Sequence, residues 1–367
     1  MKKLRIAQVA PLYESVPPQL YGGTERIVAY LTEELVRQGH DVTLFASGDS
    51  QTSARLVPVC QRALRLGECI DPLPHHLIMV EEVYRRAAEY DVIHFHVDYL
   101  HFPVSRRYGA PQITTLHGRL DLPDLVPLYR EFPDMPLSSI SDAQRQPLPW
   151  LNWQGTVYHG LPEDLLGCDD EPQGYLAFLG RVSPEKRLDL AIEIAQRAGL
   201  PLCIAAKVDR ADREYYEQVI RPLLRQPGVE FLGEIGERDK RAFLAGARGL
   251  LFPIDWPEPF GLVMIEAMAC GTPVIAFRRG SVPEVIDPGK TGFVCSTVEE
   301  AVEAVARLPE VSRQGCRKVF EQRFTAARMA RDYVNLYQRQ LERAVDGRRD
   351  HPDQRTVLHP RHQLASR

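Results

Sequence analysis

The chain has 367 residues, of which 44% are hydrophobic and 26% charged, and its formal net charge is −4. This composition is that of a soluble globular protein, which excludes fibrous and largely disordered chains, and the length suffices for two domains with separate cores. The small negative charge supplies no basic field, so we expect no nucleic-acid partner. The seven cysteines include no CxxC pair, which argues against a disulfide framework or a zinc knuckle and predicts a reducing, cytoplasmic location.

The amino-terminal run MKKLRIAQVA has the charge and apolarity of a truncated signal peptide, but Pro11 interrupts it, so it is interpreted as a first strand. No stretch approaches the roughly 20 apolar residues that a membrane-spanning helix needs. We therefore expect no transmembrane segment, while peripheral membrane contact and the oligomeric state stay open.

Apolar, strand-like runs alternate with helical patterns in the first part of the chain. A helix is predicted from Thr24, as its N-cap, to Gln38, with Gly39 as its terminator. Strands are predicted at residues 4–10, 41–47, 91–97 and 112–117. Strands and helices that take turns in this way indicate a parallel sheet.

Residues 160–174 are acidic, contain Pro and Gly and have no sustained apolar period, so they are interpreted as a linker. The alternation then resumes with a helix over 183–198. Further strands are predicted at residues 175–180, 201–207, 229–234, 249–254, 274–277 and 292–295. A helix over about 325–344 is predicted to end the fold and to pack back on the first domain, and the polar residues 346–367 are predicted to be a disordered, solvated tail.

We therefore predict an α/β protein with two doubly wound Rossmann-like domains, residues 1–165 and 172–322, that face one another across a cleft. Ligands of such sheets bind beyond the carboxyl ends of the strands. The functional residues are therefore sought in the segments that follow strands.

The segment 258–266, EPFGLVMIE, places two carboxylates around the start of a helix. Prolines on either side of Glu258 disfavour helix there, so Glu258 lies in the loop and Glu266 two turns inside. The free N–H groups of residues 260–263 lie between them and suit an anion. The alternative is that Glu258 only stabilises the helix dipole and that Glu266 is solvated. A lone charge within the apolar run LVMIEAMA weakens that alternative.

Two cations follow the first strand after the linker. Arg181 ends that strand, Ser183 is the predicted N-cap of the next helix, and Lys186 falls in its first turn. A cation there opposes the helix dipole, whereas a bound phosphate explains both cations. The alternative is that both form surface ion pairs, with Glu185 or Asp189.

Gly22 and Gly23 precede the helix at 24–38 and allow a backbone to approach a ligand closely, although any tight loop can use paired glycines. The sequence contains no GxGxxG, no GxxxxGK[ST] and no DxD. The first two absences remove the main support for nicotinamide and P-loop chemistry. The last leads us to expect no metal on a bound diphosphate.

Histidines are concentrated in VIHFHVDYLH, residues 92–101. His94, His96 and His101 with Asp98 resemble a metal site, but such residues more often contact a polar substrate at the end of a strand. His117 also ends a strand, before a glycine, which is a position that faces the cleft.

With these residues in place, the chain resembles the retaining nucleotide-sugar glycosyltransferases of family four, which have the GT-B fold. The resemblance covers about residues 3 to 340 and rests on four motifs. These are GGTER at 22–26, LHG at 116–118, GRVSPEK at 180–186 and EPFGLVMIEAMACGTPVIA at 258–276. It implies transfer of a hexose from a nucleoside diphosphate sugar, with UDP-hexose favoured and GDP-mannose possible, without metal or other cofactor. The anomeric configuration would be kept.

The resemblance also implies residue roles. Arg181 and Lys186 would bind the diphosphate, Glu266 the ribose, and Glu258 the donor sugar near its reacting carbon. Further donor contacts would come from Gly22, Gly23, His117, Gly233, Glu234, Ile235, Phe260, Gly261 and Leu262, with His117 lining the sugar pocket, and the acceptor would lie near Tyr21, His96 and Asp98. His159-Gly160 stands where the family often has Asn-Gly.

Two other functions stay open. A sugar-nucleotide epimerase shares this architecture, and so does a non-catalytic, two-lobed protein that closes on a sugar nucleotide. A glycan phosphorylase is disfavoured because no pyridoxal phosphate lysine can be identified.

Overall fold

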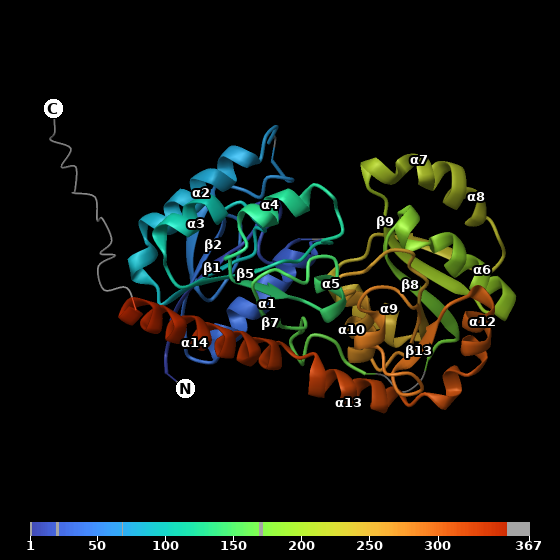
Figure 1. Cartoon of the computed structure of the whole chain (residues 1–367). Coiled ribbons are helices and arrows are strands. Elements are labelled where there is room, and N and C mark those ends of the chain that lie inside the picture. Colours follow the sequence, from blue (N-terminus) through green and yellow to red (C-terminus); the bar gives the residue numbers. More distant parts are fainter. Residues whose placement is uncertain (1, 20–21, 68, 169–171, 351–367) are drawn as a thin grey trace.

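The computed structural model describes residues 2–19, 22–67, 69–168 and 172–350, with side chains to residue 344. Two parallel sheets form two lobes that lie side by side (Figure 1). The first sheet has the order β3-β2-β1-β4-β5-β6-β7 and the second has the order β10-β9-β8-β11-β12-β13. The predicted α/β class with two doubly wound sheets is therefore confirmed.

The central strands are almost wholly buried, as expected for parallel sheets covered by helices on both faces. The first sheet consists of β1 (Arg5–Val9), β2 (Asp41–Ser47), β3 (Arg55–Cys60), β4 (Val92–Phe95), β5 (Gln112–Thr115), β6 (Leu137–Ser139) and β7 (Trp153–Thr156). The second consists of β8 (Tyr175–Arg181), β9 (Leu202–Lys207), β10 (Val229–Gly233), β11 (Ala247–Phe252), β12 (Val274–Phe277) and β13 (Gly292–Cys295).

Three strands of the first sheet were not predicted. β3 contains Pro58, β6 has three residues, and β7 is half-buried along its length. β3 forms one edge of the sheet, and β6 and β7 lie at the opposite edge. Short or proline-containing edge strands lack the continuous apolar run that marks a central parallel strand.

Helices cover both sheets. In the first lobe they are α1 (Gly23–Arg37), α2 (Leu73–Arg85), η1 (Ala87–Glu89), α3 (Phe102–Tyr108), α4 (Leu125–Glu131) and α5 (Asp142–Arg145). In the second they are η2 (Pro184–Lys186), α6 (Leu188–Ala198), η3 (Arg210–Asp212), α7 (Arg213–Tyr215), η4 (Tyr216–Ile220), α8 (Arg221–Leu223), α9 (Glu237–Ala245), α10 (Leu262–Ala269), α11 (Val282–Val285), α12 (Val298–Ala306), η5 (Leu308–Glu310) and α13 (Arg313–Arg323). None of the described helices has the length and apolar character needed to cross a bilayer.

One predicted helix start was wrong, and a second predicted helix starts after its expected N-cap Ser183 but is interrupted. α1 begins at Gly23 with Gly22 as its N-cap, so Thr24 lies inside the helix. The predicted helix 183–198 is broken, because a 3-10 turn ends at Lys186 and Arg187 adopts a left-handed φ of 51° before α6 begins. The carbonyl of Glu185 accepts a hydrogen bond from the Asp255 N–H at 2.8 Å, so a distant segment takes the acceptor that a continuous helix needs.

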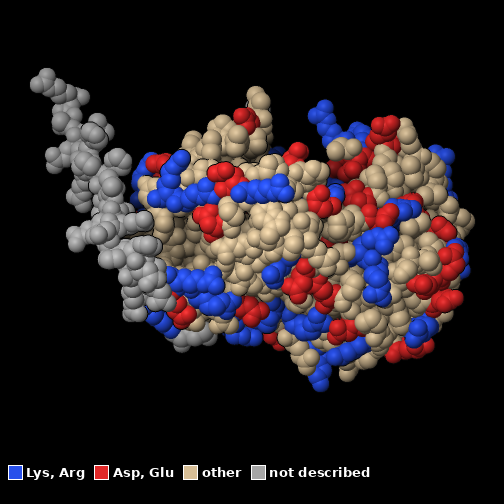
Figure 2. Space-filling model, viewed as in Figure 1, with Lys and Arg blue, Asp and Glu red and all other residues tan. Residues whose placement is uncertain are grey.

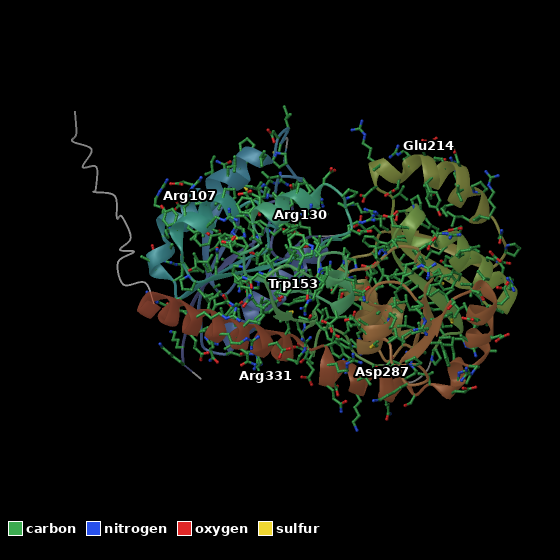
Figure 3. The ribbon with its side chains drawn as sticks, in the orientation of Figure 1. Arg107, Arg130, Trp153, Glu214, Asp287 and Arg331 are labelled. Carbon is green, nitrogen blue, oxygen red and sulfur yellow. The ribbon has the colours of Figure 1, made fainter. Side chains whose placement is uncertain are left out.

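The chain returns to the first lobe through α14 (Ala326–Asp350), the red helix in Figure 1. It contacts α1, β4 and β5 and buries Tyr333 and Tyr337 completely, while Arg331 lies on its exposed face (Figure 3). Residues 346–350 continue this helix, so the predicted start of the tail was too early. Gly347 weakens a helix by only about 1 kcal/mol, which the neighbouring residues of the helix can offset. Residues 351–367 lie outside the described part of the chain.

Two crossing segments join the lobes. The Leu161 N–H donates to the Phe324 carbonyl at 2.9 Å, and the Ala326 N–H donates to the Leu161 carbonyl at 2.7 Å. Gly160 makes this crossing possible, because a Cβ there would lie 2.3 Å from the carbonyl oxygen of Thr325. The start of the predicted linker is therefore held by hydrogen bonds to Phe324 and Ala326.

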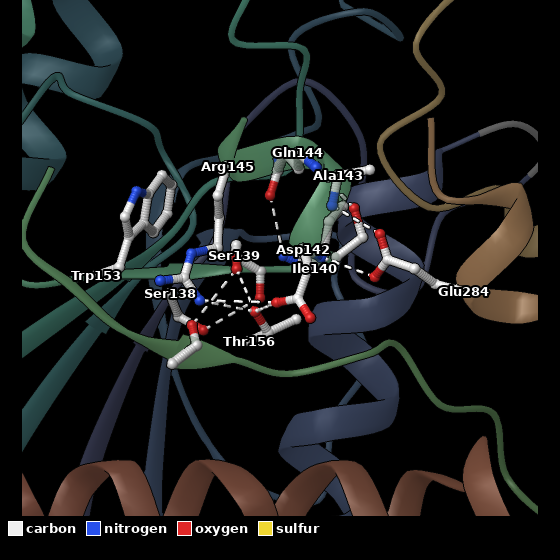
Figure 4. Close-up of polar contacts among 12 residues, drawn as sticks. Ser138, Ser139, Ile140, Asp142, Ala143, Gln144, Arg145, Trp153, Thr156 and Glu284 are labelled. Carbon is white, nitrogen blue, oxygen red and sulfur yellow. Dashed lines mark hydrogen bonds and ion pairs between the residues drawn. The ribbon is translucent and has the colours of Figure 1, made fainter. Parts of the chain in front are cut away.

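A second connection joins the lobes through a carboxylate. Glu284 of α11 accepts hydrogen bonds from the backbone N–H groups of Asp142 at 2.8 Å and Ala143 at 2.6 Å, at the start of α5 (Figure 4). An acidic group at a helix N-terminus is a favourable arrangement. On the face in Figure 2, basic and acidic side chains are interspersed over both lobes.

Replacement of Gly160 by Ala should force the two crossing segments apart. We expect Gly160→Ala to lower the free energy of unfolding by about 1–3 kcal/mol, as overpacking commonly does, measured by chemical denaturation. Gly118→Ala is the control, because a Cβ at Gly118 would meet no atom within 4 Å. Equal stability of the two variants would contradict the packing role of Gly160.

Candidate active site in the interlobe cleft

A cavity of about 300 Å³ lies between the lobes and is lined by residues of both. The first lobe contributes the start of α1 and the loop after β5. The second contributes the ends of β8 and β11 and the start of α10. Of the sequence-predicted residues, the structure brings Gly22, Gly23, His117, Arg181, Lys186, Glu234, Ile235, Glu258, Phe260, Gly261, Leu262 and Glu266 to this cavity.

Three predicted contacts are not brought to the cavity, and a fourth cannot be placed. Gly233, His96 and Asp98 are absent from its lining, and Tyr21 lies outside the described residues. Gly233 ends β10 with a φ of 76°, one residue before the lining residue Glu234. His96 is buried behind His117, and Asp98 is exposed elsewhere. The sequence cannot tell a strand-end side chain that faces the cavity from one that supports it.

The loop before α10 is fixed by contact with a neighbouring turn. The Ser281 N–H donates to the carbonyl of Glu258 at 3.0 Å, and a Cβ on Gly280 would lie 2.4 Å from the Glu258 nitrogen. Gly261 then turns the chain into the helix with a φ of 78°, and Gly271 ends it with a φ of 72°, as predicted. The first residues of α10 line the cavity, so its N-terminal N–H groups are available to an anion.

Glu258 is buried and shares one carboxylate oxygen between two donors. The Lys186 ammonium pairs with Oε2, and the Trp256 indole N–H donates to the same atom at 2.9 Å. The ammonium also lies 4.9 Å from the centre of the Trp256 ring. The predicted alternative for Lys186, a surface pair with Glu185 or Asp189, was therefore wrong.

The structure agrees with both interpretations of Arg181, as a phosphate ligand and as a member of a surface ion pair. Its guanidinium pairs with Glu185 at 2.5 Å and with Asp212 at 3.3 Å, as the ion-pair alternative predicts. It also lines the cavity, and its side chain is 32% exposed. A guanidinium has five N–H donors, so these pairs leave donors for a ligand.

Glu266 is 2% exposed and is neutralised by two cations, so the solvated alternative was wrong. Lys240 of α9 donates at 2.6 Å, and the Arg26 guanidinium from the first lobe lies 3.6 Å away. Burial raises the pKa of the Glu266 carboxyl, but the charges of Lys240 and Arg26 outweigh burial and lower it overall. Arg26 also pairs with Glu237 at 2.9 Å, so one side chain of α1 contacts two acids of the other lobe.

His117 is one of two stacked histidines in the cavity wall. Its ring lies 5.4 Å from that of His159, with 16° between the planes. Burial lowers the pKa of His117 to about 3, so the ring is neutral at physiological pH. The Nδ1 atoms of both rings are buried without a hydrogen-bond partner among the described residues.

The histidines that resembled a metal site have other partners. His94 is hydrogen-bonded to Tyr337 and Thr115, and His101 to Ser105 and Thr114. Within the described ranges, no three His, Cys, Asp or Glu side chains are arranged to hold a metal ion. These polar atoms serve the packing of the first lobe.

Sequence reasoning assigned no site role to several further residues of the cavity wall, among them Arg26, Lys240, Trp256 and His159. Arg26 belongs to the GGTER motif, and its positive charge is opposite to that of Glu266. The sequence around Lys240 gave no indication that it lines the cavity, because a lysine on a helix such as α9 is ordinarily solvated. His159 was noted only as a departure from Asn.

Two family profiles match consecutive parts of the chain. Glycosyltransferase family 4 matches residues 21–155, and glycosyl transferases group 1 matches residues 169–320. The first therefore falls in the lobe of α1 and the second in the lobe of α10.

Related proteins include enzymes whose names refer to different sugars. The O-antigen chain mannosyltransferase C of Escherichia coli is 24% identical over 375 residues, which span 91% of this chain and 99% of that protein. A probable sucrose-phosphate synthase of Thermosipho melanesiensis is 30% identical over 170 residues. That match spans 44% of this chain and only 40% of the length of the synthase.

Solved structures with this fold span nearly the whole chain. AviGT4, a glycosyltransferase involved in avilamycin A biosynthesis, has a TM-score of 0.70 and 25% identity, and the match covers 92% of this chain and 98% of AviGT4. Anabaena HepE in complex with UDP-glucose has a TM-score of 0.66 and 18% identity, with 94% and 100% covered. The chain therefore belongs to the family 4 glycosyltransferases and has their two-lobed GT-B fold.

Proposed function

We propose that this glycosyltransferase is a hexosyltransferase that uses a nucleoside diphosphate sugar, keeps the anomeric configuration and needs no metal ion. One observation carries the proposal: Arg181, Lys186, Glu258, Glu266 and the N-terminus of α10 line a single cavity between the lobes. UDP-hexose is the favoured donor, since HepE, which has this fold, was solved with UDP-glucose. GDP-mannose is the second candidate, because one relative is a mannosyltransferase.

The diphosphate would occupy the space between Arg181, Lys186 and the start of α10. Lys186 is paired with Glu258. A phosphate that approaches Lys186 replaces the carboxylate as its partner, so the pair opens as the donor binds. Gly23 lies opposite α10, where a Cβ would be 3.8 Å from a methyl group of Leu262. A glycine there leaves room for the phosphates.

The nucleoside would lie deeper in the second lobe. Glu266 stays ionised because Lys240 and Arg26 hold its pKa low, so its oxygens accept hydrogen bonds from the two ribose hydroxyls. Glu234 and Ile235 line the same cavity after β10, where the base would lie.

In the transfer step the bond between the anomeric carbon and the phosphate oxygen breaks, and the acceptor oxygen bonds to the same face of that carbon. Positive charge develops on the sugar ring and negative charge on the leaving diphosphate. Arg181, Lys186 and the N–H groups of α10 would stabilise the diphosphate. The proton of the acceptor hydroxyl moves to a leaving phosphate oxygen. Glu258 would stabilise the ring charge without forming a covalent bond.

Incubation with UDP-glucose or GDP-mannose separates this function from its two rivals. Release of the nucleoside diphosphate supports transfer, whereas an epimerised sugar nucleotide supports the epimerase. Binding without turnover supports a non-catalytic, two-lobed binding protein. A thermal-shift screen of nucleotide sugars would identify the donor, because a ligand that binds only the native state stabilises it. The acceptor, the oligomeric state, membrane contact and the cytoplasmic location stay predictions or open questions.

Removal of the Lys186 ammonium should weaken diphosphate binding. A hydrogen bond to a charged group contributes about 1.5–3 kcal/mol, so we expect Lys186→Ala to weaken binding of UDP, or of GDP if that is the donor nucleotide, by roughly 10- to 150-fold in calorimetry. Lys318→Ala is the control, because Lys318 is exposed on α13. Unchanged affinity in the Lys186 variant would remove this residue from the site.

Neutralisation of Glu258 should affect the chemical step more than donor binding. A carboxylate that stabilises the ring charge acts mainly in the transition state, so Glu258→Gln should lower kcat by at least tenfold with a smaller change in donor affinity. Steady-state kinetics and calorimetry on the same variant test this. Glu303→Gln, on the exposed side of α12, is the matched control. A kcat equal to that of the wild type would exclude Glu258 from the mechanism.

A further inference from the structure

A line of buried hydrogen bonds connects α14 to the cavity wall. The Gln8 side-chain amide donates to the Tyr337 hydroxyl at 3.1 Å, and its oxygen lies 2.8 Å from Nε2 of His96. Nδ1 of His96 lies 2.9 Å from Nε2 of His117. Gln8 and Tyr337 are fully buried and His96 is 2% exposed, so water does not compete for these bonds. Residues more than 300 positions apart thus meet behind one side chain of the cavity.

The atoms in this line set the direction of each bond. The Gln8 oxygen only accepts, so Nε2 of His96 carries a proton. In a neutral imidazole the other nitrogen is then an acceptor, so Nδ1 of His96 accepts from Nε2 of His117. His117 then has no proton on Nδ1. Burial lowers the pKa of His96 and of His117, which excludes doubly protonated rings at neutral pH.

The orientation of Gln8, with its NH₂ group toward the Tyr337 hydroxyl, agrees with one proton arrangement of a second branch. The Tyr337 hydroxyl lies 2.8 Å from Nδ1 of His94, and Nε2 of His94 lies 2.7 Å from the Thr115 hydroxyl. When Tyr337 gives its single proton to His94, it has only lone pairs left for Gln8, so the Gln8 NH₂ group must face it. The amide oxygen of Gln8 is thereby turned toward His96.

We propose that Gln8, oriented by Tyr337, is a positioning residue that fixes His117 as the tautomer protonated on Nε2. His117 then offers an unprotonated Nδ1 to the ligand as a hydrogen-bond acceptor. Two observations support a ligand role for this atom: His117 lines the cavity, and its Nδ1 is buried without a partner among the described residues. An acceptor selects a hydroxyl group, so the site would favour a sugar that carries a hydroxyl at this point. This last step rests on the proposed function.

The tautomer is measured without any ligand. Long-range ¹H–¹⁵N NMR on histidine-labelled protein distinguishes protonated from unprotonated ring nitrogens, and a His117→Gln variant identifies the resonances of His117. We expect Nε2 protonated and Nδ1 unprotonated in the wild type. Tyr337→Phe removes the acceptor that orients Gln8, so a mixture of tautomers, or the Nδ1-protonated form, should appear. A wild-type ring protonated on Nδ1 would overturn the proposal.

Tyr333→Phe is the matched control. Tyr333 is also fully buried on α14, and its hydroxyl bonds Thr115 at 3.0 Å rather than Gln8. Its loss leaves Thr115 able to accept from His94, so His117 should keep its tautomer. Gln8→Met provides a second test of similar shape should Tyr337→Phe fail to fold. A His117 tautomer unchanged by Tyr337→Phe, or by Gln8→Met in its place, would show that these residues do not set it.

A binding measurement separates this proposal from the proposed function. Calorimetry with UDP-glucose, UDP, GDP-mannose and GDP compares each nucleotide sugar with its nucleotide. Gln8→Met should weaken the sugar nucleotide by about 2- to 10-fold, the range of one hydrogen bond, and the nucleotide by less than twofold. Equal losses would overturn the contact between Nδ1 and the sugar. Failure of the wild type to bind any of the four would count against the proposed function, while the NMR result would still decide the tautomer.

Discussion

Pairing of buried charges in the cavity between the lobes is the constraint on which the site depends. Glu258 and Glu266 are both nearly inaccessible to water, and an unpaired carboxylate in such a place is strongly unfavourable. Lys186 neutralises the first, and Lys240 with Arg26 neutralises the second. The two pairs differ in what a ligand can do with them. In the proposed function a phosphate would replace Glu258 as the partner of Lys186, whereas Glu266 would keep its cations and accept hydrogen bonds from hydroxyl groups.

The same constraint links the site to the position of the lobes. Arg26 belongs to α1 of the first lobe, and both of its acidic partners belong to the second. Glu284 of the second lobe likewise bonds the start of α5. Together with the hydrogen bonds at Leu161, these contacts join the lobes whose residues form the cavity wall. Apolar contacts join the lobes as well, since Ile140, which follows β6, lies in one buried cluster with Phe260 and Met264 of the second lobe.

α14 has two consequences for the molecule. It covers α1 and the first sheet with a tyrosine-bearing face, which is ordinary helix packing. It also places the Tyr337 hydroxyl beside Gln8 of β1, at the far end of the hydrogen-bond line that reaches His117. A buried polar network of this kind is favourable only when every member has a partner. The unpartnered atom at its end, Nδ1 of His117, is therefore the informative exception.

The sequence by itself determined the elements whose cause is local. The strands at 41–47, 274–277 and 292–295 have the predicted bounds because their apolar runs end at polar or turn residues. The bounds of α10 follow from Gly261 and Gly271. The motifs at 180–186 and 258–276 identified Arg181, Lys186, Glu258 and Glu266, which line the cavity. Only the tertiary structure decided which of these charges meet. The break at Arg187 depends on Asp255, the partner of Lys186 is Glu258, and His96 supports His117 instead of facing the cavity. These outcomes rest on contacts between residues far apart in the chain, and no local pattern of polarity or propensity encodes them.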